Sequence, residues 1–381
     1  MRLACLLYKY FPYGGMQRDF RRFVEELHGR GHHCRVYYLQ WQGDALPGAE
    51  LRRVPVSALT NHRRNERYLR WVREDLAADP VDGVIGFNKM PGLDIYFAAD
   101  SCYLEKAHED RSWLYRRGAR FKHFAHYERA VFAPASATEI LLISERQRSS
   151  FRRCYHTPEQ RLHLLPPGIA QDRRAPPDAA ARRAAKRDSL GLASGQLALL
   201  LVGSGFITKG LDRAIAALAR VRAAQPGADA RLLVAGQDRS RRFQRLARRL
   251  GVGAAVSFLG GRDDVPDLLL AADLLVHPAR HEAAGMVLLE ALVAGLPAIV
   301  TDVCGYAPHV QAARGGIVLS SPYRQEQLEA AILRTVDGVF RAECRASALT
   351  YAEQTDLYSM HRTGAALIES LLRRKQAAAG D

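Results

Sequence analysis

The sequence has no run of about 20 consecutive apolar residues, the length that a membrane-spanning helix needs. The apolar stretch Met1–Lys9 lacks the longer core and the small-residue cleavage site of a signal peptide, so we expect it to form a buried strand. The six cysteines are scattered and form no Cys-x-x-Cys pair, which disfavours a zinc site and a disulfide framework. Isolated thiols of this kind are typical of a reducing cytoplasm.

A second feature is an excess of positive charge. The 381 residues carry a formal charge of +15, and the pI is near 9.8. Such a balance favours an anionic partner, which includes nucleic acid, anionic lipid and phosphorylated substrates. Many of the arginines lie in Ala-rich stretches, where a solvated helix face explains them equally well.

Short apolar runs alternate with amphipathic stretches along the whole chain, which is typical of parallel sheets covered by helices. A length of 381 residues suits two domains better than one core. The sequence therefore predicts an α/β fold with two doubly wound, Rossmann-like domains. Ligands bind such domains at the carboxyl ends of their strands. The predicted strands are Leu3–Tyr8, Cys34–Leu39, Gly83–Phe87, Ile140–Ser144, Leu197–Val202, Arg231–Ala235, Val256–Leu259, Leu274–His277 and Ala298–Thr301.

Helices are predicted at about Met16–Arg30 and Asn65–Ala78. The alternation of strands and helices is interrupted at Leu164–Ile169. The polar, Arg-rich stretch Gln171–Asp188 that follows is the best candidate for an interdomain connection. A Pro-containing loop inside one domain is the alternative.

Two glutamates eight residues apart flank a small-residue turn in His281–Ala291, just after a predicted strand. Gly285 leaves room for a ligand beside the backbone, and the amides that follow lie at a helix N-terminus, where phosphates and hydroxyls bind. Glu282 and Glu290 are spaced to hold the two ends of an extended ligand. Alternatively, Glu282 caps the helix and Glu290 forms a surface ion pair.

Glycine-rich loops follow the first strand of each predicted domain. Val202–Gly210 ends in Lys209 and suits a diphosphate, although it lacks the order of a P-loop. Arg213, one turn later, is expected on a solvated face. Gly14 and Gly15 permit close backbone approach to a phosphate or a sugar, or else form a tight turn with positive φ.

The block from Glu282 to Glu290, with Gly295–Val300 after it, resembles the retaining GT-B glycosyltransferases of family 4. The resemblance covers nearly the whole chain. Tyr8–Phe20 and Gly86–Asp94 are similar to one subgroup, the lipopolysaccharide core glycosyltransferase I enzymes, which attach the first outer-core hexose to an inner-core heptose. The resemblance implies an acceptor-side domain over residues 1–167 and a UDP-sugar-binding domain over residues 168–355. It also implies a cleft between them and a C-terminal helix, about 356–381, that packs back on the first domain.

The resemblance also implies roles for single residues. Glu282 would contact the donor sugar, Glu290 the ribose hydroxyls, and Lys209 the departing diphosphate, while Asp100 would lie near the anomeric carbon and the acceptor hydroxyl. The donor-binding set is Gly14, Gly15, Gly203, Lys209, Arg262, Glu282, Ala284, Gly285, Met286, Val287 and Glu290, and the catalytic set is Asp100, Lys209 and Glu282. The acceptor-binding set is Lys9, Arg18, His62, Arg63, Asn88 and Lys89. No Asp-x-Asp sequence occurs, so neither a metal nor another cofactor is expected.

The stretch from Trp113 to Arg129 carries five Lys or Arg, one Glu and five aromatic residues. Trp and Tyr favour a membrane interface, and basic residues there attract anionic lipid. We expect this stretch to bind the inner face of the cytoplasmic membrane and expect no nucleic acid partner. In the alternative, its aromatic residues pack inward on an ordinary helix.

The sequence thus predicts a cytoplasmic, peripheral enzyme that transfers a hexose from a UDP-sugar to a heptose of the lipopolysaccharide inner core, with retention. Glucose is the family default, and a UDP-galactose or UDP-N-acetylhexosamine donor is the alternative. More distant alternatives are a UDP-sugar epimerase and a non-enzymatic protein that binds lipid or nucleic acid.

Overall fold

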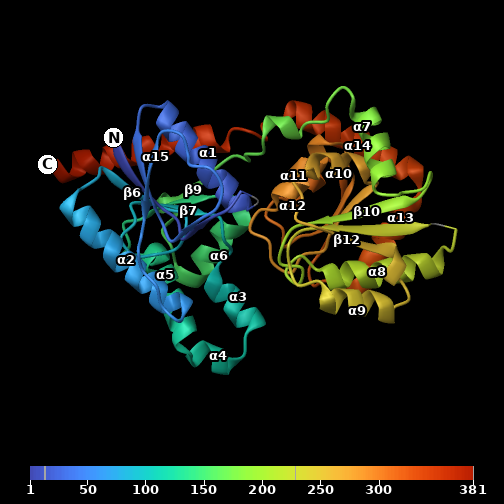
Figure 1. The fold of residues 1–381 in the computed structure, drawn as a ribbon, viewed down its shortest axis with the longest axis horizontal. Helices are drawn as coiled ribbons and strands as arrows, with labels where there is room; N and C mark the ends of the chain where they lie inside the picture. The colour runs from blue at the N-terminus through green and yellow to red at the C-terminus, as the bar shows by residue number, and fades with distance from the viewer. Residues whose placement is uncertain (13, 228, 381) are drawn as a thin grey trace. The chain divides into compact units, whose positions relative to one another are not determined.

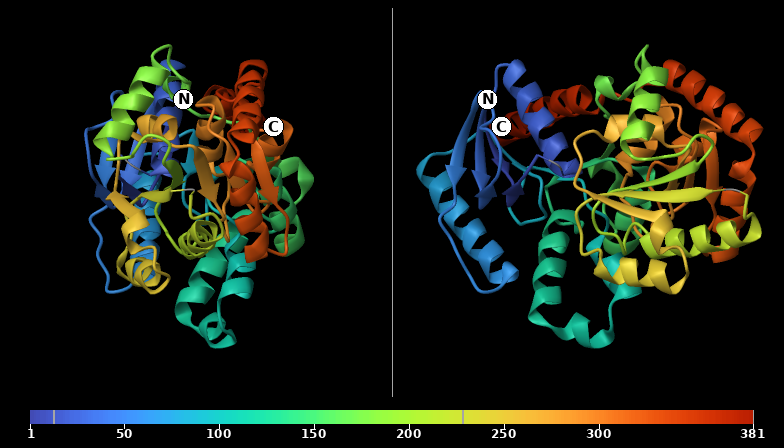
Figure 2. Two further views of the ribbon diagram at one scale, coloured as in Figure 1. Left: turned by 90° about the vertical axis from the view of Figure 1, so that its right-hand side faces the viewer. Right: turned by 45° about the vertical axis from the view of Figure 1, so that its right-hand side comes forward.

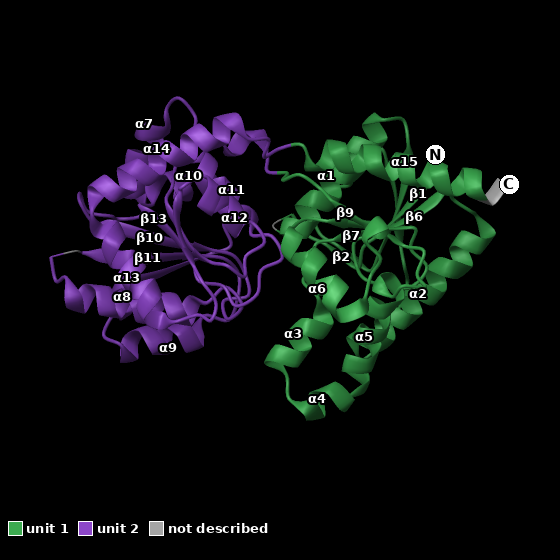
Figure 3. Ribbon diagram, turned by 180° about the vertical axis from the view of Figure 1, so that it is seen from behind, with its two compact units in different colours: residues 1–168, 359–381 green, residues 169–358 purple. Residues whose placement is uncertain are grey.

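The computed structural model describes residues 1–12, 14–227 and 229–380. They form two compact units, one of residues 1–168 with 359–381 and one of residues 169–358 (Figures 1 and 3). Each unit contains one main sheet, and all paired strands in it are parallel. In the part of the chain described, no helix has both the length and the apolar character to cross a bilayer.

The sheet of unit 1 has the order β5-β3-β1-β6-β7-β8-β9. Counted along the chain, this is the 3-2-1-4-5-6 order of a Rossmann fold with one further strand. The strands are β1 Arg2–Leu6, β3 His33–Tyr38, β5 Ala49–Arg53, β6 Gly83–Gly86, β7 Ile95–Ala98, β8 Glu139–Leu142 and β9 Leu162–Leu164. The short strands β2 Lys9–Tyr10 and β4 Gln40–Trp41 pair separately.

Helices cover both faces of this sheet (Figure 3). The face under α2, α5 and α6 holds a core cluster that includes Tyr68, Val131 and Phe151. On the other face, α15 packs against α1, where the His361 ring lies 5.1 Å from the Phe23 ring. The helices are α1 Gly15–Gly29, α2 Asn61–Ala78, α3 Tyr103–Asp110, α4 Trp113–Arg117, α5 Ala119–Phe132, α6 Glu145–Tyr155 and α15 Met360–Gly380.

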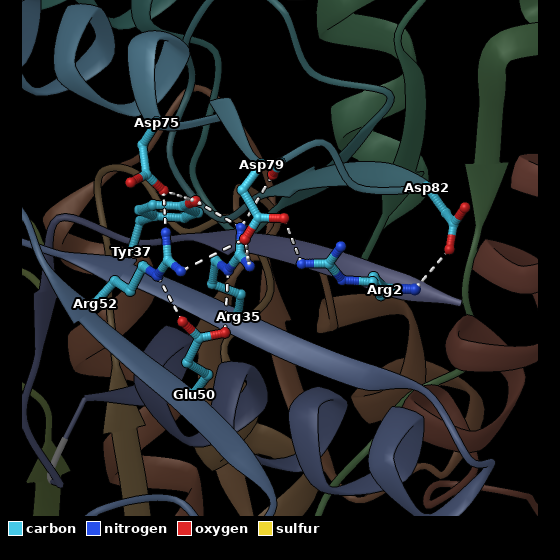
Figure 4. Close-up of polar contacts among 8 residues, drawn as sticks. All are labelled: Arg2, Arg35, Tyr37, Glu50, Arg52, Asp75, Asp79 and Asp82. Atoms are coloured by element: carbon cyan, nitrogen blue, oxygen red, sulfur yellow. Dashed lines mark hydrogen bonds and ion pairs between the residues drawn. The ribbon is translucent and has the colours of Figure 1, made fainter. Parts of the chain in front are cut away.

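A polar network joins β1, β3 and β5 to the end of α2 (Figure 4). The Arg35 side chain at its centre is 3% exposed and contacts Glu50 and Asp79. Burial alone would raise the pKa of Glu50, but hydrogen bonds from Arg52 and Arg35 outweigh it and lower that pKa. Hydrogen bonds from Arg2 and Arg35 lower the pKa of Asp79. The stability that both carboxylates contribute is therefore present above their unfolded pKa of about 4 and is lost as the pH falls.

The sheet of unit 2 has the order β12-β11-β10-β13-β14-β15, again the Rossmann order. Figure 1 shows α8 and α9 on one side of it and α10, α11 and α14 on the other. The strands are β10 Leu197–Val202, β11 Ala230–Ala235, β12 Val256–Gly260, β13 Leu274–His277, β14 Ala298–Thr301 and β15 Gly316–Leu319. The helices are α7 Ala179–Ser189, α8 Leu211–Ala224, α9 Arg241–Arg249, α10 Val265–Ala271, α11 Met286–Val293, α12 Ala307–Ala312, α13 Gln325–Val336 and α14 Gly338–Gln354.

The predicted doubly wound α/β fold is confirmed, and β10, β13 and β14 have the predicted bounds. The prediction for Gln171–Asp188 was wrong, because much of that stretch forms α7 and packs on α10 within unit 2. Its Arg183 and Arg187 contact the Asp273 carboxylate, so these charges hold a helix in place. Helix α2 begins one turn earlier than predicted, at Asn61.

Candidate active site

A polar cluster at the carboxyl ends of β10 and β13 joins Lys209, His277 and Glu282. The Lys209 ammonium contacts Oε2 of Glu282, and the Nε2 atom of His277 lies 3.1 Å from the same oxygen. The Glu282 side chain is 13% exposed and the Lys209 side chain 19%, whereas His277 is fully buried. A cation, a carboxylate and an imidazole thus lie together where the loops after β10 and β13 meet.

Backbone and ion-pair contacts hold the two loops of this cluster together. Gly210 adopts φ +74°, and a Cβ on it would lie 2.0 Å from the Pro278 carbonyl oxygen, so only glycine permits this approach. The Arg280 guanidinium binds Asp212 at 2.8 and 2.9 Å and donates to the Ile207 carbonyl oxygen. Lys209 therefore reaches Glu282 from a loop that is fixed at both ends.

The charge of Glu282 is set by its neighbours. Burial alone would raise its pKa, but the positive charge of Lys209 and the hydrogen bond from His277 lower the pKa to about 2. Burial and the charge of Glu282 raise the pKa of the neighbouring Cys304 thiol to about 12. At neutral pH the site thus holds an ionised carboxylate, which accepts hydrogen bonds and cannot donate them.

Helix α11 follows this carboxylate directly. Gly285, with φ +91°, is its N-cap, and no side chain caps the helix, so the alternative of Glu282 as a cap is wrong. Glu290 is 5% exposed and lies 3.8 Å from the Nε atom of Arg173, which also rules out the surface ion pair. The first-turn amides at Met286 and Val287 have no acceptor within the helix, as at every helix start.

The other predicted donor residues of unit 2 differ in their contacts. Ala284 is buried, and its carbonyl oxygen accepts from the Tyr306 amide. Gly203 has φ +132° and lies against the Lys209 side chain. The Arg262 guanidinium is bidentate on Asp264. Arg213, expected on a solvated face, instead donates to the Pro278 and Ala279 carbonyl oxygens and stacks on Tyr323.

In unit 1, the predicted glycines open α1. Gly14 is the N-cap with φ −82°, and Gly15 has no neighbouring atom where a Cβ would stand, so a turn with positive φ is not their role. Lys9 is exposed, and its carbonyl oxygen accepts from the Gln17 amide. Arg18 is half-buried in α1, and Tyr13 of the same motif lies outside the described residues.

Asp100 is exposed in the loop after β7, and its carbonyl oxygen accepts from the Gln147 amide. A fully buried carboxylate, Glu128, holds the rest of that loop, because it accepts from the Tyr103 and Leu104 amides at 2.7 and 2.9 Å. The Lys89 ammonium pairs with Glu128 and donates to the Ser101 carbonyl oxygen. Lys89 therefore holds the Asp100 loop through Glu128 and Ser101 and does not project into solvent.

The remaining acceptor candidates lie in two places. The Asn88 side-chain oxygen accepts from the Tyr8 amide at 2.8 Å, which ties the loop after β6 to the end of β1. His62 and Arg63 lie in the first turn of α2, where the His62 ring is 6.0 Å from the His123 ring of α5. The structure thus joins His62 to α5 and Asn88 to the β1 loop.

Family models match both halves of the chain. The model described as Glycosyltransferase Family 4 matches residues 13–173, and the one described as Glycosyl transferases group 1 matches residues 182–348. The lipopolysaccharide glucosyltransferase WaaG of Escherichia coli strain K12 is 45% identical over 369 residues, which are 97% of this chain and 98% of that protein. The chain belongs to the family 4 glycosyltransferases.

Solved structures agree with this assignment. A crystal structure of WaaG, described as a glycosyltransferase involved in lipopolysaccharide biosynthesis, matches with a TM-score of 0.91 and 44% identity over 96% of this chain and 99% of that one. Anabaena Alr3699/HepE in complex with UDP-glucose matches with a TM-score of 0.75 over 97% and 100%, and at 17% identity it shares the fold alone. The predicted family and the GT-B fold of this glycosyltransferase are confirmed.

Two buried residues of this glycosyltransferase escaped the sequence analysis. His277 was read only as the end of a strand, and Glu128 only as one acid in a basic stretch. A single Glu among five Lys or Arg on an amphipathic helix is a weak signal of a buried partner.

The stretch from Trp113 to Arg129 forms α4 and most of α5, which with α3 extend away from the unit 1 sheet (Figure 2). Trp113 and Leu114 are 55% and 63% exposed. Phe124 and Tyr127 instead pack inward against Tyr103 and His123. We call the exposed basic and large apolar residues between positions 111 and 122 the α4–α5 surface; they are Arg111, Trp113, Leu114, Arg117, Arg120 and Lys122.

Proposed function

We propose that this glycosyltransferase moves a hexose from a UDP-sugar to a heptose of the lipopolysaccharide inner core, with retention at the anomeric carbon. The WaaG relative, named a lipopolysaccharide glucosyltransferase, supports glucose as the hexose. The single observation that carries the proposal is the contact of Lys209 and His277 with one oxygen of an ionised Glu282 at the start of α11.

In this proposal each group of unit 2 meets one part of the donor. Glu282 accepts hydrogen bonds from sugar hydroxyls, and Glu290 accepts them from the ribose. The first-turn amides of α11 and the ammonium of Lys209 stabilise the negative charge that develops on the departing diphosphate. Lys209 keeps further N–H donors for this task while it contacts Glu282. Lys209 and the helix amides stabilise the charge of the leaving group, and we propose on this ground that transfer needs no metal.

The acceptor contacts are assigned to unit 1. Asp100 is placed beside the acceptor hydroxyl, with Lys9, Arg18, His62, Arg63 and Asn88 as the contacts of the inner core. The bond from the acceptor oxygen to the anomeric carbon forms on the face from which the diphosphate leaves. The hydroxyl proton passes to an oxygen of the departing UDP, so charge and atoms balance.

Product analysis tests this function. The enzyme is incubated with UDP-glucose, UDP-galactose or UDP-N-acetylglucosamine, a truncated inner-core acceptor and EDTA, and the product is weighed by mass spectrometry. We expect one hexose to be added from UDP-glucose, with UDP released in equal amount. Interconversion of UDP-sugars without an acceptor would instead identify an epimerase. No reaction with any of the three UDP-sugars would favour the non-enzymatic protein that binds lipid or nucleic acid.

We also propose that the enzyme works at the cytoplasmic face of the inner membrane and that the α4–α5 surface attaches it there. Trp113 and Leu114 supply apolar side chains at the tip of α4, and the Arg117 guanidinium stacks 4.4 Å from the centre of the Trp113 ring. Basic residues beside an anionic leaflet contribute about 1 kcal/mol each. The arrangement suits shallow insertion with the arginines at headgroup level.

Leu114→Ala combined with Trp113→Ala is expected to reduce binding to vesicles that contain anionic lipid by about tenfold or more, because two exposed apolar side chains leave the interface. Co-sedimentation with such vesicles measures the effect. Val339→Ala is the matched control, since Val339 is 66% exposed on unit 2. Equal loss in the control, or binding that does not weaken as salt rises, would contradict this attachment.

A further inference from the structure

His277 is a histidine that the proposed reaction has not yet used. It is the last residue of β13 and has no exposed surface, yet its ring reaches the carboxylate five residues further along the chain. A histidine buried for packing alone has no need to meet the one carboxylate assigned to the donor sugar. The contact therefore calls for a role in the site.

The surroundings of His277 define which of its nitrogens carries the proton. An ionised carboxylate only accepts, so Nε2 must donate its hydrogen to Oε2 of Glu282. The other nitrogen, Nδ1, is buried and has no hydrogen-bond partner among the residues that the structure describes. A second proton there would be an unsatisfied buried donor, which is costly. Burial accordingly lowers the pKa of His277, and the ring stays neutral while it donates.

The two donors to Glu282 leave one of its oxygens open. Lys209 and His277 both contact Oε2, and no described residue is seen to donate to Oε1. Rotation of the carboxylate would break both contacts at once. Oε1 is thus the atom that remains to accept a hydrogen bond from a ligand.

Lys209 and His277 differ in how firmly they can hold the carboxylate. Lys209 has a long, flexible side chain, and its ammonium is also the group assigned to the diphosphate. The His277 ring has two torsions, and it is fully buried. When the diphosphate of a bound UDP-sugar contacts Lys209, His277 is the residue that still holds the Glu282 carboxylate in place.

We infer that His277 is a positioning residue, which fixes the Glu282 carboxylate so that Oε1 faces the hydroxyls of the donor sugar. The inference rests on the proposed function, since it deepens the role given there to Glu282. It concerns the sugar and not the nucleotide. The loss of His277 should therefore affect the sugar-dependent part of binding and turnover and spare the binding of UDP.

Two substitutions in the full-length protein separate this role from simple packing. His277→Gln keeps an N–H donor close to the position of Nε2, whereas His277→Leu fills the site without a donor. Calorimetry with UDP and steady-state kinetics with UDP-glucose and acceptor give the readouts. For His277→Leu we expect kcat/KM to fall about 10- to 100-fold, the range for a lost hydrogen bond to a charged group, with UDP affinity within about threefold of wild type. His277→Gln should recover most of the loss.

Adding Glu282→Gln completes the test. If His277 acts through Glu282, His277→Leu should cost little further activity in a Glu282→Gln background. Equal loss in His277→Gln and His277→Leu, equal loss of UDP and UDP-glucose affinity, or full additivity with Glu282→Gln would each overturn the inference. If His277→Leu does not fold, His277→Met serves in its place. A wild-type enzyme that turns over no UDP-sugar would contradict the proposed function. A His277→Leu enzyme with wild-type kcat/KM would contradict only the positioning role.

Discussion

Glu282→Gln is expected to lower kcat/KM for the UDP-sugar by about 100- to 1,000-fold, the scale seen when one group that stabilises a transition state is removed. The amide keeps the shape of the side chain but removes the charge that Lys209 contacts. It also replaces one acceptor oxygen with a donor, so either His277 or the sugar hydroxyl loses its partner. Affinity for UDP should stay within about threefold, because the sugar is absent from UDP. Kinetics with UDP-glucose and calorimetry with UDP measure the two effects.

Two further glutamates in unit 2 serve as comparisons for Glu282. Glu290→Gln should weaken UDP itself, because this buried residue is assigned to the ribose. Glu343→Gln, on the exposed side of α14, should behave like the wild type. A Glu282→Gln enzyme with nearly wild-type kcat/KM, or one that loses UDP affinity as strongly as Glu290→Gln, would contradict the assignment of Glu282 to the sugar.

Much of the fold could be predicted because the inner strands of both sheets are short apolar runs, such as Leu197–Val202. The edge strands β5, β9 and β15 were not predicted, and neither was the buried inner strand β7. β5, with the sequence Ala-Glu-Leu-Arg-Arg, has no apolar run that would predict a strand, although Glu50 and Arg52 belong to the network around Arg35 (Figure 4). The Arg-rich stretch at α7 was mistaken for a linker, because the carboxylates that pair with it lie 78 to 90 residues further along the chain.

The site was predictable as a set of residues but not as a set of contacts. Lys209 and Glu282 were each identified from a local motif, while the ion pair between them joins positions 73 residues apart. His277 has no local motif at all, since a histidine at a strand end usually signals nothing. The role of His277 is indicated by its burial and by its contact with Glu282, and both can be known only from the folded structure.

Glu128→Ala is expected to destabilise unit 1 by about 3 to 5 kcal/mol, the scale for removing one partner of a buried ion pair. The change leaves the Lys89 ammonium, only 12% exposed, without its carboxylate. It also removes the acceptor of the Tyr155 hydroxyl and of two amides at the start of α3. Urea unfolding followed by circular dichroism measures the loss.

Glu145→Ala is the matched control for Glu128→Ala, since Glu145 pairs with Arg148 on the exposed side of α6 and should cost less than about 1 kcal/mol. The double variant Lys89→Met with Glu128→Leu should be more stable than Glu128→Ala, because no unpaired charge remains buried. Even so, the double variant should lose activity, because the loop that carries Asp100 loses the Lys89 bond to Ser101 and the Glu128 bonds to α3, and of the contacts described above it keeps the Gln147 bond to the Asp100 carbonyl oxygen. Full activity in a stable double variant would mean that the position of Asp100 does not depend on this buried pair.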